Sequence, residues 1–532
     1  MRKRLMLALA LMLLMGLLAP LTTAQEPVIL RYPINPDPEH LNPFTATTVA
    51  IGTITRNIYE GLTQLDFNTS EPMPALAESW DISDDNLTYT FHIRQGVLYH
   101  DVAGVEWDNG DREVKAEDFV WTAQMYDTDD ETISQHPELL DGVVGAEAFR
   151  NGEADSIEGV QALDDYTLQI TLEQPNRLFF TAGAGGLNAV PREAYEQLGD
   201  AFNTTPVGTG PFKFVEWLRD DKLTLTKNEE YWDPELPKAD GIEYVNVPED
   251  NTALGMYRNG ELDFLFSFPS GQRQAVIDEF SDQFHEIPGL NVRYFGFKMD
   301  TGFFSENPLV RQAFNHAFNR DLVWNELMEG ARYPADQGVL PPSMPASTPS
   351  VQYDYDLEKA AQLLEEAGFP NGEGLPELTV YIFASARDEL SFPVLQQDLA
   401  TLGVTLNIEI EDNSTYWSHI GEDEVVMFLS GWSAGVNDPS DVFNFLFLDA
   451  RDDTHYDNPE VNDLLRAAMT EYDADARNQL YQQAHDLIMA DAPWIVSAYS
   501  KVAWLQQPWV EGFEPFGGGT YTARLKYVTK SS

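Results

Sequence analysis

The alternation of apolar and polar residues along the chain predicts both half-buried strands and amphipathic helices. A period of two, typical of strands with one buried face, occurs in residues 87–93, 167–172 and 222–227. Other segments repeat their apolar residues with helical spacing, and one of them is followed by the helix-stopping residue Gly368. The expected helices cover residues 310–329, 356–367, 393–402, 459–472 and 474–490.

The order of these elements indicates a mixed α/β protein. Residues 378–410 predict a strand, a helix and a second strand at 404–410, which is the usual form of a parallel crossover. The chain before about residue 285 is richer in strands and in turns with Gly and Pro. With 532 residues, of which 43% are hydrophobic, the chain is too long for one ordinary core, and we expect at least two lobes.

The first 24 residues have the three parts of a secretory signal peptide. A basic cluster at 1–4 precedes an apolar run from Leu5 to Leu18, and Ala24 is a small residue at the expected cleavage point. The run is shorter than the roughly 18 to 20 apolar residues of a spanning helix, so export with cleavage is favoured over a membrane anchor. The sequence has no cysteine, which excludes disulfides and an N-terminal lipid anchor. We therefore expect a periplasmic or secreted extracytoplasmic protein.

The net charge of −55 excludes two classes of partner. Nucleic acid and anionic lipid surfaces repel such a protein, and the acidic residues are spread along the chain as on a solvated surface.

One segment resembles a catalytic motif. Residues 431–435 fit the nucleophile-elbow pattern G-x-S-x-G with Ser433 as the nucleophile, and His455 and His485 follow later in the chain. An elbow requires a helix directly after the serine, whereas Pro439 suits a helix start several residues too late. A serine hydrolase is therefore an alternative hypothesis only, and we expect no enzyme.

Metal and cofactor sites have little support in the sequence. His455 stands near several aspartates, and residues 127–131 form an acidic run, but both patterns are common in so acidic a chain. Neither paired histidines at helical spacing, a calcium loop nor a phosphate-binding glycine loop is present. Trp432 is the tryptophan most suited to a ligand cleft, because it follows an apolar strand directly and small residues succeed it.

An ordered series of short motifs resembles the family 5 extracellular solute-binding proteins, which include the dipeptide, oligopeptide and nickel binders of ABC importers. The motifs are Leu41-Asn42-Pro43, Asn57 to Thr63, Pro74 to Trp80, Ser83-Asp84-Asp85, Ile93 to Val97, Lys115 to Val120, Val207-Gly208-Thr209-Gly210-Pro211-Phe212, Tyr231-Trp232, Val310 to Ala313 and Asn319-Arg320-Asp321. Each motif alone is weak, but their order and spacing match the family over nearly the whole chain after residue 24.

The resemblance implies the two-lobed periplasmic-binding-protein fold, with a hinge between the lobes and a ligand enclosed between them. Lobe I would hold residues 25–290 and 496–532, with residues 55–205 as an extra subdomain, and lobe II would hold 291–495. The protein would be a monomer that binds a small peptide and delivers it to ABC permease and ATPase subunits.

The resemblance also implies where the ligand binds. In peptide-binding relatives, the segment that matches residues 431–439 lines the cleft, which makes Trp432, Ser433, Ala434, Gly435 and Asn437 candidate ligand-binding residues. An aspartate in that segment pairs with the peptide's amino group, but the matching position here is Gly435. Because a buried ammonium without a carboxylate is costly, either Asp438 or Asp37 replaces this aspartate, or the ligand has no free amine.

Two further alternatives stay open at this point. An oligosaccharide ligand would stack its rings on aromatic side chains. A chaperone-like or sensory protein would use the same fold to pass its ligand to a receptor.

Overall fold

The computed structural model describes residues 26–66, 71–107, 110–176, 179, 183–269, 271–349, 353–386, 389–422 and 424–531. The expected signal peptide, 1–24, lies outside the described residues. In the part of the chain that is described, no helix combines the length and the apolar character needed to cross a membrane.

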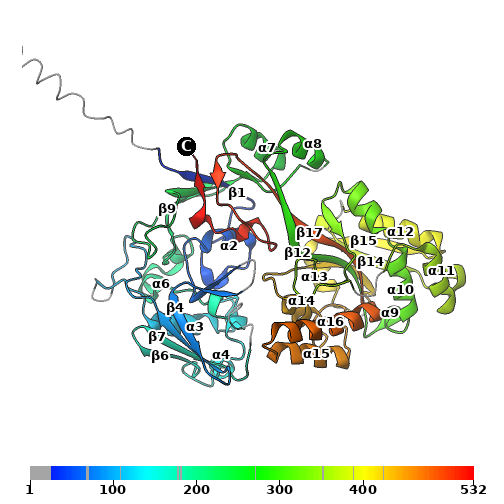
Figure 1. Ribbon diagram of the computed structural model, residues 1–532, viewed down its shortest axis with the longest axis horizontal. Coiled ribbons are helices and arrows are strands. Elements are labelled where there is room, and N and C mark those ends of the chain that lie inside the picture. Colours follow the sequence, from blue (N-terminus) through cyan, green and yellow to red (C-terminus); the bar gives the residue numbers. More distant parts are fainter. Residues whose placement is uncertain are drawn as a thin grey trace, which may run out of the picture.

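The chain forms two bodies joined by two long strands (Figure 1). The first body, which we call lobe I, contains a four-stranded sheet, a second four-stranded antiparallel sheet and a short hairpin. In sheet order these are β1 (Ile29–Ile34), β10 (Gly241–Asn246), β9 (Lys222–Lys227) and β8 (Phe212–Leu218); β4 (Ala77–Ile82), β5 (Thr88–Ile93), β7 (Thr167–Thr171) and β6 (Val160–Asp164); and β2 (Thr63–Leu65) with β3 (Pro72–Pro74). The main helices of this lobe are α2 (Val49–Thr55), α3 (Ala116–Tyr126), α4 (Ala146–Arg150), α5 (Gly183–Gly186), α6 (Arg192–Leu198), α7 (Asp250–Arg258) and α8 (Arg273–Glu279).

The second body, lobe II, is built on a seven-stranded mixed sheet. The strands of this sheet are β11 (Phe264–Leu265), β17 (Trp494–Gln506), β12 (Phe284–Phe297), β16 (Met427–Ser433), β14 (Leu378–Phe383) and β15 (Leu406–Glu411), with β13 (Arg332–Pro334) paired to β17. Strand β11 pairs with the far end of β17, and its Phe264 packs in the core of lobe I. The helices of lobe II are α9 (Gly302–Ser305), α10 (Pro308–Ala317), α11 (Leu357–Glu366), α12 (Ser391–Thr401), α13 (Asn413–His419), α14 (Pro439–Leu446), α15 (Pro459–Thr470) and α16 (Ala474–Asp491).

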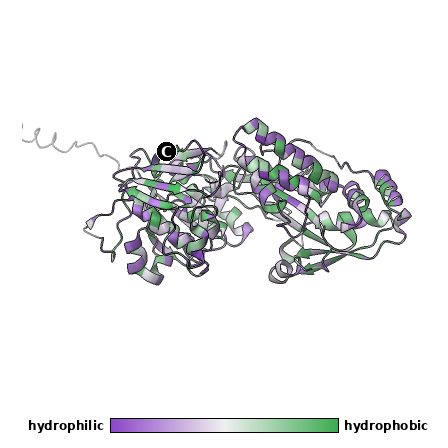
Figure 2. Cartoon of the chain, turned by 90° about the horizontal axis from the view of Figure 1, so that it is seen from below, coloured by the Kyte–Doolittle hydropathy of each residue, from purple (hydrophilic) through white to green (hydrophobic). Residues whose placement is uncertain are grey.

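Helices cover both faces of the lobe II sheet. Successive residues of β12 point to opposite faces, so that Tyr294 packs in one buried cluster with side chains of α13 to α16, and Phe295 packs in another with side chains of α10 to α12. The covering helices carry hydrophilic and hydrophobic residues side by side (Figure 2), as amphipathic helices do. This arrangement leaves the ends of the strands, and not the faces of the sheet, to form a site.

Many of the sequence-based elements are confirmed. The strands expected at 87–93, 167–172 and 222–227 are β5, β7 and β9. The predicted crossover is β14, α12 and β15, and the two strands pair in parallel with Leu378 opposite Leu406. Helix α11 begins after Asp356, whose carboxylate accepts the backbone N–H of Lys359, and it ends before Gly368.

The single helix expected over 310–329 is wrong. Helix α10 ends at Ala317, Phe318 has extended backbone, and a separate helical turn covers Leu322–Leu327. The break lets the buried guanidinium of Arg320 donate to the carbonyl oxygens of Asn315 and Val496, which a continuous helix would not bring together. Periodicity alone cannot reveal a buried arginine that bonds the backbone of a distant strand.

Strands β12 and β17 run antiparallel through both bodies, and their pairing is interrupted midway. Residues 284–288 of β12 pair with residues 501–505 of β17, and residues 292–296 pair with residues 494–499. The register therefore shifts between Pro288 and Val292. Gly289 lies in this interruption, where a Cβ would approach the Ser500 hydroxyl oxygen to 1.9 Å. The expected domain boundaries at 290/291 and 495/496 fall in these two strands, and the division into domains at these residues stays a prediction.

Candidate functional site

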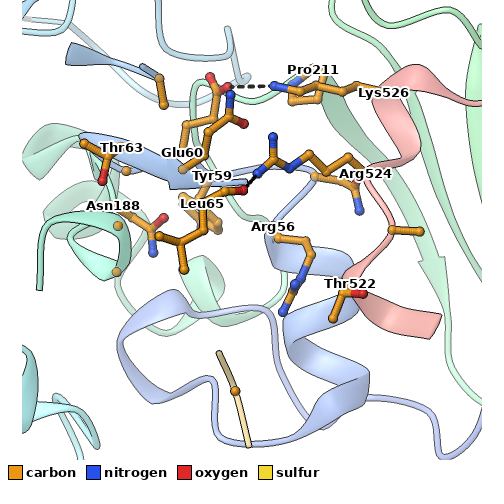
Figure 3. Close-up of a pocket in the computed structure, with 18 of the residues that line it drawn as sticks. Arg56, Tyr59, Glu60, Thr63, Leu65, Asn188, Pro211, Thr522, Arg524 and Lys526 are labelled. Atoms are coloured by element: carbon orange, nitrogen blue, oxygen red, sulfur yellow. Dashed lines mark hydrogen bonds and ion pairs between the residues drawn. The ribbon is translucent and has the colours of Figure 1, made fainter. Parts of the chain in front are cut away.

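A cavity of about 370 Å³ lies where lobe I meets the end of β16 in lobe II, and its volume is within the range of roughly 300 to 1,000 Å³ found for small-molecule sites. Lobe II contributes Gly435 and Val436 to the wall. Lobe I contributes residues that follow α2, residues of α5, and the chain after β17 (Figure 3): Arg56, Asn57, Tyr59, Glu60, Gly61, Thr63, Gln64, Leu65, Ala75, Gly185, Gly186, Asn188, Pro211, Thr522, Ala523, Arg524 and Lys526.

The lobe II wall is held in place by one carboxylate. Asp441, in the first turn of α14, accepts the indole N–H of Trp432 at 2.7 Å through Oδ1. Its Oδ2 accepts the backbone N–H groups of Gly435 at 2.9 Å and Val436 at 3.1 Å. Burial raises the pKa of Asp441, and these three donors oppose the increase. The Asp441 carboxylate thus fixes the conformation of the loop between β16 and α14.

Replacing Asp441 by Ala therefore should weaken ligand binding more than it lowers stability. The loop is partly exposed, so water can satisfy the released N–H groups, but the free loop must be ordered again when a ligand binds. We expect Kd to rise about tenfold with a small change in Tm, measured by isothermal titration calorimetry and thermal unfolding. An unchanged Kd would show that the loop holds its conformation without Asp441.

In lobe I, a buried network surrounds Glu60. Its carboxylate accepts the hydroxyl of Tyr231 at 2.6 Å and the indole N–H of Trp232 at 3.1 Å, and the Lys526 ammonium lies 3.9 Å away. Burial raises the pKa of Glu60 and lowers the pKa of Lys526, while each residue's charge opposes the shift of the other. Burying the charges of Glu60 and Lys526 therefore costs free energy, which the hydrogen bonds to Glu60 offset.

The candidate residues expected from the sequence are distributed around this cavity in different ways. Gly435 lines it, whereas Trp432 is outside the wall and stacks on Phe445 with the ring centroids 5.6 Å apart. Ser433 is exposed at the end of β16, opposite Asn291 of β12, and Ala434 is buried. Asn437 is half-buried in the same loop.

Asp438 and Asp37 are both engaged by other protein groups. Asp438 is the N-cap of α14 and forms a two-pronged pair with Arg477, with distances of 2.7 and 2.8 Å. Asp37 accepts the indole N–H of Trp217 at 3.1 Å, and among the described residues the cavity wall does not include it. The expectation that one of them receives a ligand's amine finds no support in these contacts.

The geometry required for a serine hydrolase is not present around Ser433. The residues after β16 form a loop, and α14 begins only at Pro439. His455 contacts Asp300 at 2.9 Å, and the buried His485 accepts the backbone N–H of Val339 at 3.1 Å. Within the described ranges, neither histidine hydrogen-bonds to Ser433, and no group of three metal-ligand side chains occurs.

Sequence reasoning missed the charged residues of lobe I. Glu60 lies within the motif Asn57 to Thr63, but the motif does not indicate a buried ion pair, and no local pattern marks Arg56, Arg524 or Lys526 as site residues. Composition offers one indication. Basic residues are scarce in this chain, with 32 Lys and Arg against 87 Asp and Glu, so a basic residue directly beside a family motif, such as Arg56 before Asn57, is a candidate for a functional role.

Comparison with known proteins gives a consistent result. Residues 71–454 match the family described as bacterial extracellular solute-binding proteins, family 5 Middle. The glutathione-binding protein GsiB of Escherichia coli O1:K1 / APEC is 30% identical over 480 residues, which is 87% of this chain and 88% of that protein.

Solved structures show the same fold. The ABC transporter-associated periplasmic binding protein DppA from Helicobacter pylori, in complex with the peptide STSA, superposes with a TM-score of 0.73 at 28% identity over 95% of this chain and 98% of that one. The unliganded open form of the periplasmic murein tripeptide binding protein MppA superposes with a TM-score of 0.78 at 24% identity, over 95% and 98% of the two chains. With this fold and the family match, the chain belongs to the family 5 bacterial extracellular solute-binding proteins, which are binding proteins and not enzymes.

Proposed function

We propose that this protein captures short peptides between its two lobes outside the cytoplasm and delivers them to the permease and ATPase subunits of an ABC importer. The observation that carries the proposal is the cavity whose wall comes from both lobes, with Gly435 and Val436 on one side and residues 56–65 on the other. A ligand that touches both walls favours the closed arrangement of the lobes, because only that arrangement gives both sets of contacts.

The hinge of this motion is the ribbon of β12 and β17. Two paired strands join the lobes, and the interrupted register at 288–292 supplies a point where the ribbon can bend without breaking the pairing on either side. The division into lobes at 290/291 and 495/496 is part of this proposal.

Similar proteins support peptides as the ligand class. They include glutathione-binding proteins and a periplasmic binding protein in complex with the peptide STSA. In peptide binding by added-strand pairing, backbone groups of the protein bond to the backbone of an extended ligand. Since the N–H groups of Gly435 and Val436 already donate to Asp441, a peptide must pair with this segment without these two groups.

Native mass spectrometry of the purified protein, followed by release and identification of the bound ligand, tests the proposal. We expect short peptides. Recovery of oligosaccharides with no peptide, or no binding of any peptide in calorimetry, would contradict it.

A pair of glycine variants locates the site. Gly435 and Gly421 are both exposed residues of lobe II, and a Cβ at either has ordinary space around it. Gly435→Phe should fill the cavity and abolish peptide binding, whereas the matched control Gly421→Phe should bind as the unaltered protein does. Equal binding by the two variants would place the ligand elsewhere.

A further inference from the structure

The cavity concentrates positive charge in a protein of the opposite sign. Three cations, Arg56, Arg524 and Lys526, line it, whereas Glu60 is the acidic residue of its wall, and Asp66 acts electrostatically on Arg524. The chain as a whole has a net charge of −55. A mainly cationic wall in such a chain is therefore a local property of this site and does not follow from composition.

Arg56 is the cation with the least compensation. It caps the C-terminus of α2, and its Nε donates to the carbonyl oxygen of Gly52 at 2.8 Å while the guanidinium lies 5.2 Å from the ring centroid of Tyr521. Across the described part of the chain, no carboxylate forms an ion pair with it. Burial among protein atoms lowers the pKa of Arg56 and the positive charge of Arg524 acts in the same direction, while the phenol groups of Tyr521, Tyr32 and Tyr244 oppose the shift.

Arg56 nevertheless faces the cavity. Arg56 is an exposed residue even though it lines the cavity, and in Figure 3 its side chain extends beside Thr522, with Arg524 above it. A planar guanidinium presents its N–H groups as a fork that matches the two oxygens of a carboxylate. A ligand carboxylate at this place would supply the anion that the protein does not.

The acidic side chains around the cavity are already committed. Glu60 accepts bonds from Tyr231 and Trp232, has a third donor in Thr209 at 3.4 Å, and lies next to Lys526. Asp441 holds the loop of lobe II with three bonds, and Asp438 is paired with Arg477. A positive charge on the ligand would find no uncommitted acid among these carboxylates.

We infer that the site selects short peptides with a net negative charge, placing one ligand carboxylate on Arg56 beside Arg524. This inference rests on the proposed function and narrows it to ligands that carry at least two carboxylates. Glutathione, a tripeptide with two carboxylates and one amine, meets this requirement and is a suitable probe.

The test compares three tripeptides that differ in one side chain, together with glutathione, by isothermal titration calorimetry on the full protein. Ala-Glu-Ala, Ala-Gln-Ala and Ala-Lys-Ala have net charges of −1, 0 and +1. We expect Ala-Glu-Ala and glutathione to bind at least about tenfold more tightly than Ala-Gln-Ala, which lacks the carboxylate that would accept a charged hydrogen bond from Arg56. Ala-Lys-Ala should bind most weakly, because its ammonium group is repelled by the cations of the cavity.

Variants of Arg56 assign the effect. Arg56→Gln should lower the affinity for Ala-Glu-Ala about tenfold to a hundredfold and should change that for Ala-Gln-Ala little. Arg56→Lys retains the positive charge but lacks the planar guanidinium. Its affinity for Ala-Glu-Ala should therefore lie between those of the unaltered protein and Arg56→Gln. The control is Arg192→Gln, which removes the same charge from the surface of lobe I. Arg192 forms an exposed ion pair with Glu196, with Nε and Oε1 2.7 Å apart, and the variant should bind all peptides as the unaltered protein does.

Three results would overturn the inference. Ala-Lys-Ala could bind as tightly as Ala-Glu-Ala in the unaltered protein, a comparison that needs no variant. Arg56→Gln could weaken all peptides equally, which would show that Arg56 serves lobe closure and not ligand charge. If no peptide binds at all, the proposed function itself fails, and this outcome differs from binding without charge selection.

Discussion

Replacing Gly208 by Ala should destabilise the protein by about 3 kcal/mol or more, because the added methyl group collides with backbone. A Cβ at Gly208 would lie 2.2 Å from the carbonyl oxygen of Ile58 and 2.8 Å from Cδ1 of Tyr59. The same Ile58 oxygen accepts the N–H of Gly210 at 2.8 Å, so it cannot move away without losing that bond. Relief of the collision must shift the segment that carries Glu60, and we therefore expect ligand affinity to fall as well.

Gly255→Ala is the matched control for this prediction. Gly255 lies inside helix α7, and a Cβ there meets no atom within 4 Å. Alanine favours the helix over glycine, so this variant should gain up to about 1 kcal/mol. Urea unfolding followed by tryptophan fluorescence measures both variants. Equal stability of the two would mean that the backbone at Ile58 yields at little cost.

Breaking the pair between Asp438 and Arg477 should cost about 3 to 5 kcal/mol, as for other ion pairs that lose one partner in a protein interior. The Arg477 side chain is 5% exposed and that of Asp438 14% exposed. Arg477→Met would leave the Asp438 carboxylate with the Ser440 N–H and hydroxyl as its remaining donors. The control Arg466→Met removes a surface pair with Asp449, in which both side chains are about half exposed, and should change stability by less than about 1 kcal/mol.

The effect of this pair should depend on pH. Burial opposes the charge of Asp438, but Arg477 and the Ser440 bonds prevail and hold the pKa of Asp438 below its ordinary value. A carboxylate with a lowered pKa stabilises the folded state above its unfolded pKa of about 3.9, and this contribution is lost as the pH falls through the folded pKa. The difference in unfolding free energy between the unaltered protein and Asp438→Asn should therefore be full above pH 5 and shrink as the pH is lowered below 4. A difference that stays constant down to pH 2 would contradict the assignment.

How far the sequence predicts this protein differs between its elements. Strands such as β5 and β9 follow from their own alternation, because one face of each is buried and the other is not. The parallel pairing of β14 and β15 follows from the helix between them. Both predictions need only local information and the general rules of connection.

The site depends on contacts that no local pattern encodes. Asp438 has the appearance of an available cleft carboxylate until its partner Arg477, 39 residues later, is brought against it. Arg56 and Arg524 are more than 450 positions apart and meet only because the chain returns to lobe I after β17. The resemblance to a family indicated the loop of lobe II, where the motif lies, but it could not indicate a charge distribution that belongs to this chain.

The return of the chain to lobe I also fixes the order in which the two halves can be completed during synthesis. Residues that belong to lobe I by their packing emerge first, from Ile29 onward, but this lobe is finished only when Arg524 and Lys526 reach the cavity and Lys530 pairs with Asp263 at 2.7 Å. Lobe II, apart from β17, lies between these two parts of the sequence. A chain still being made can therefore possess nearly all of lobe II while lobe I lacks its last pieces, and a ribosome that stops before residue 524 would yield a protein without two of the three cations of the cavity.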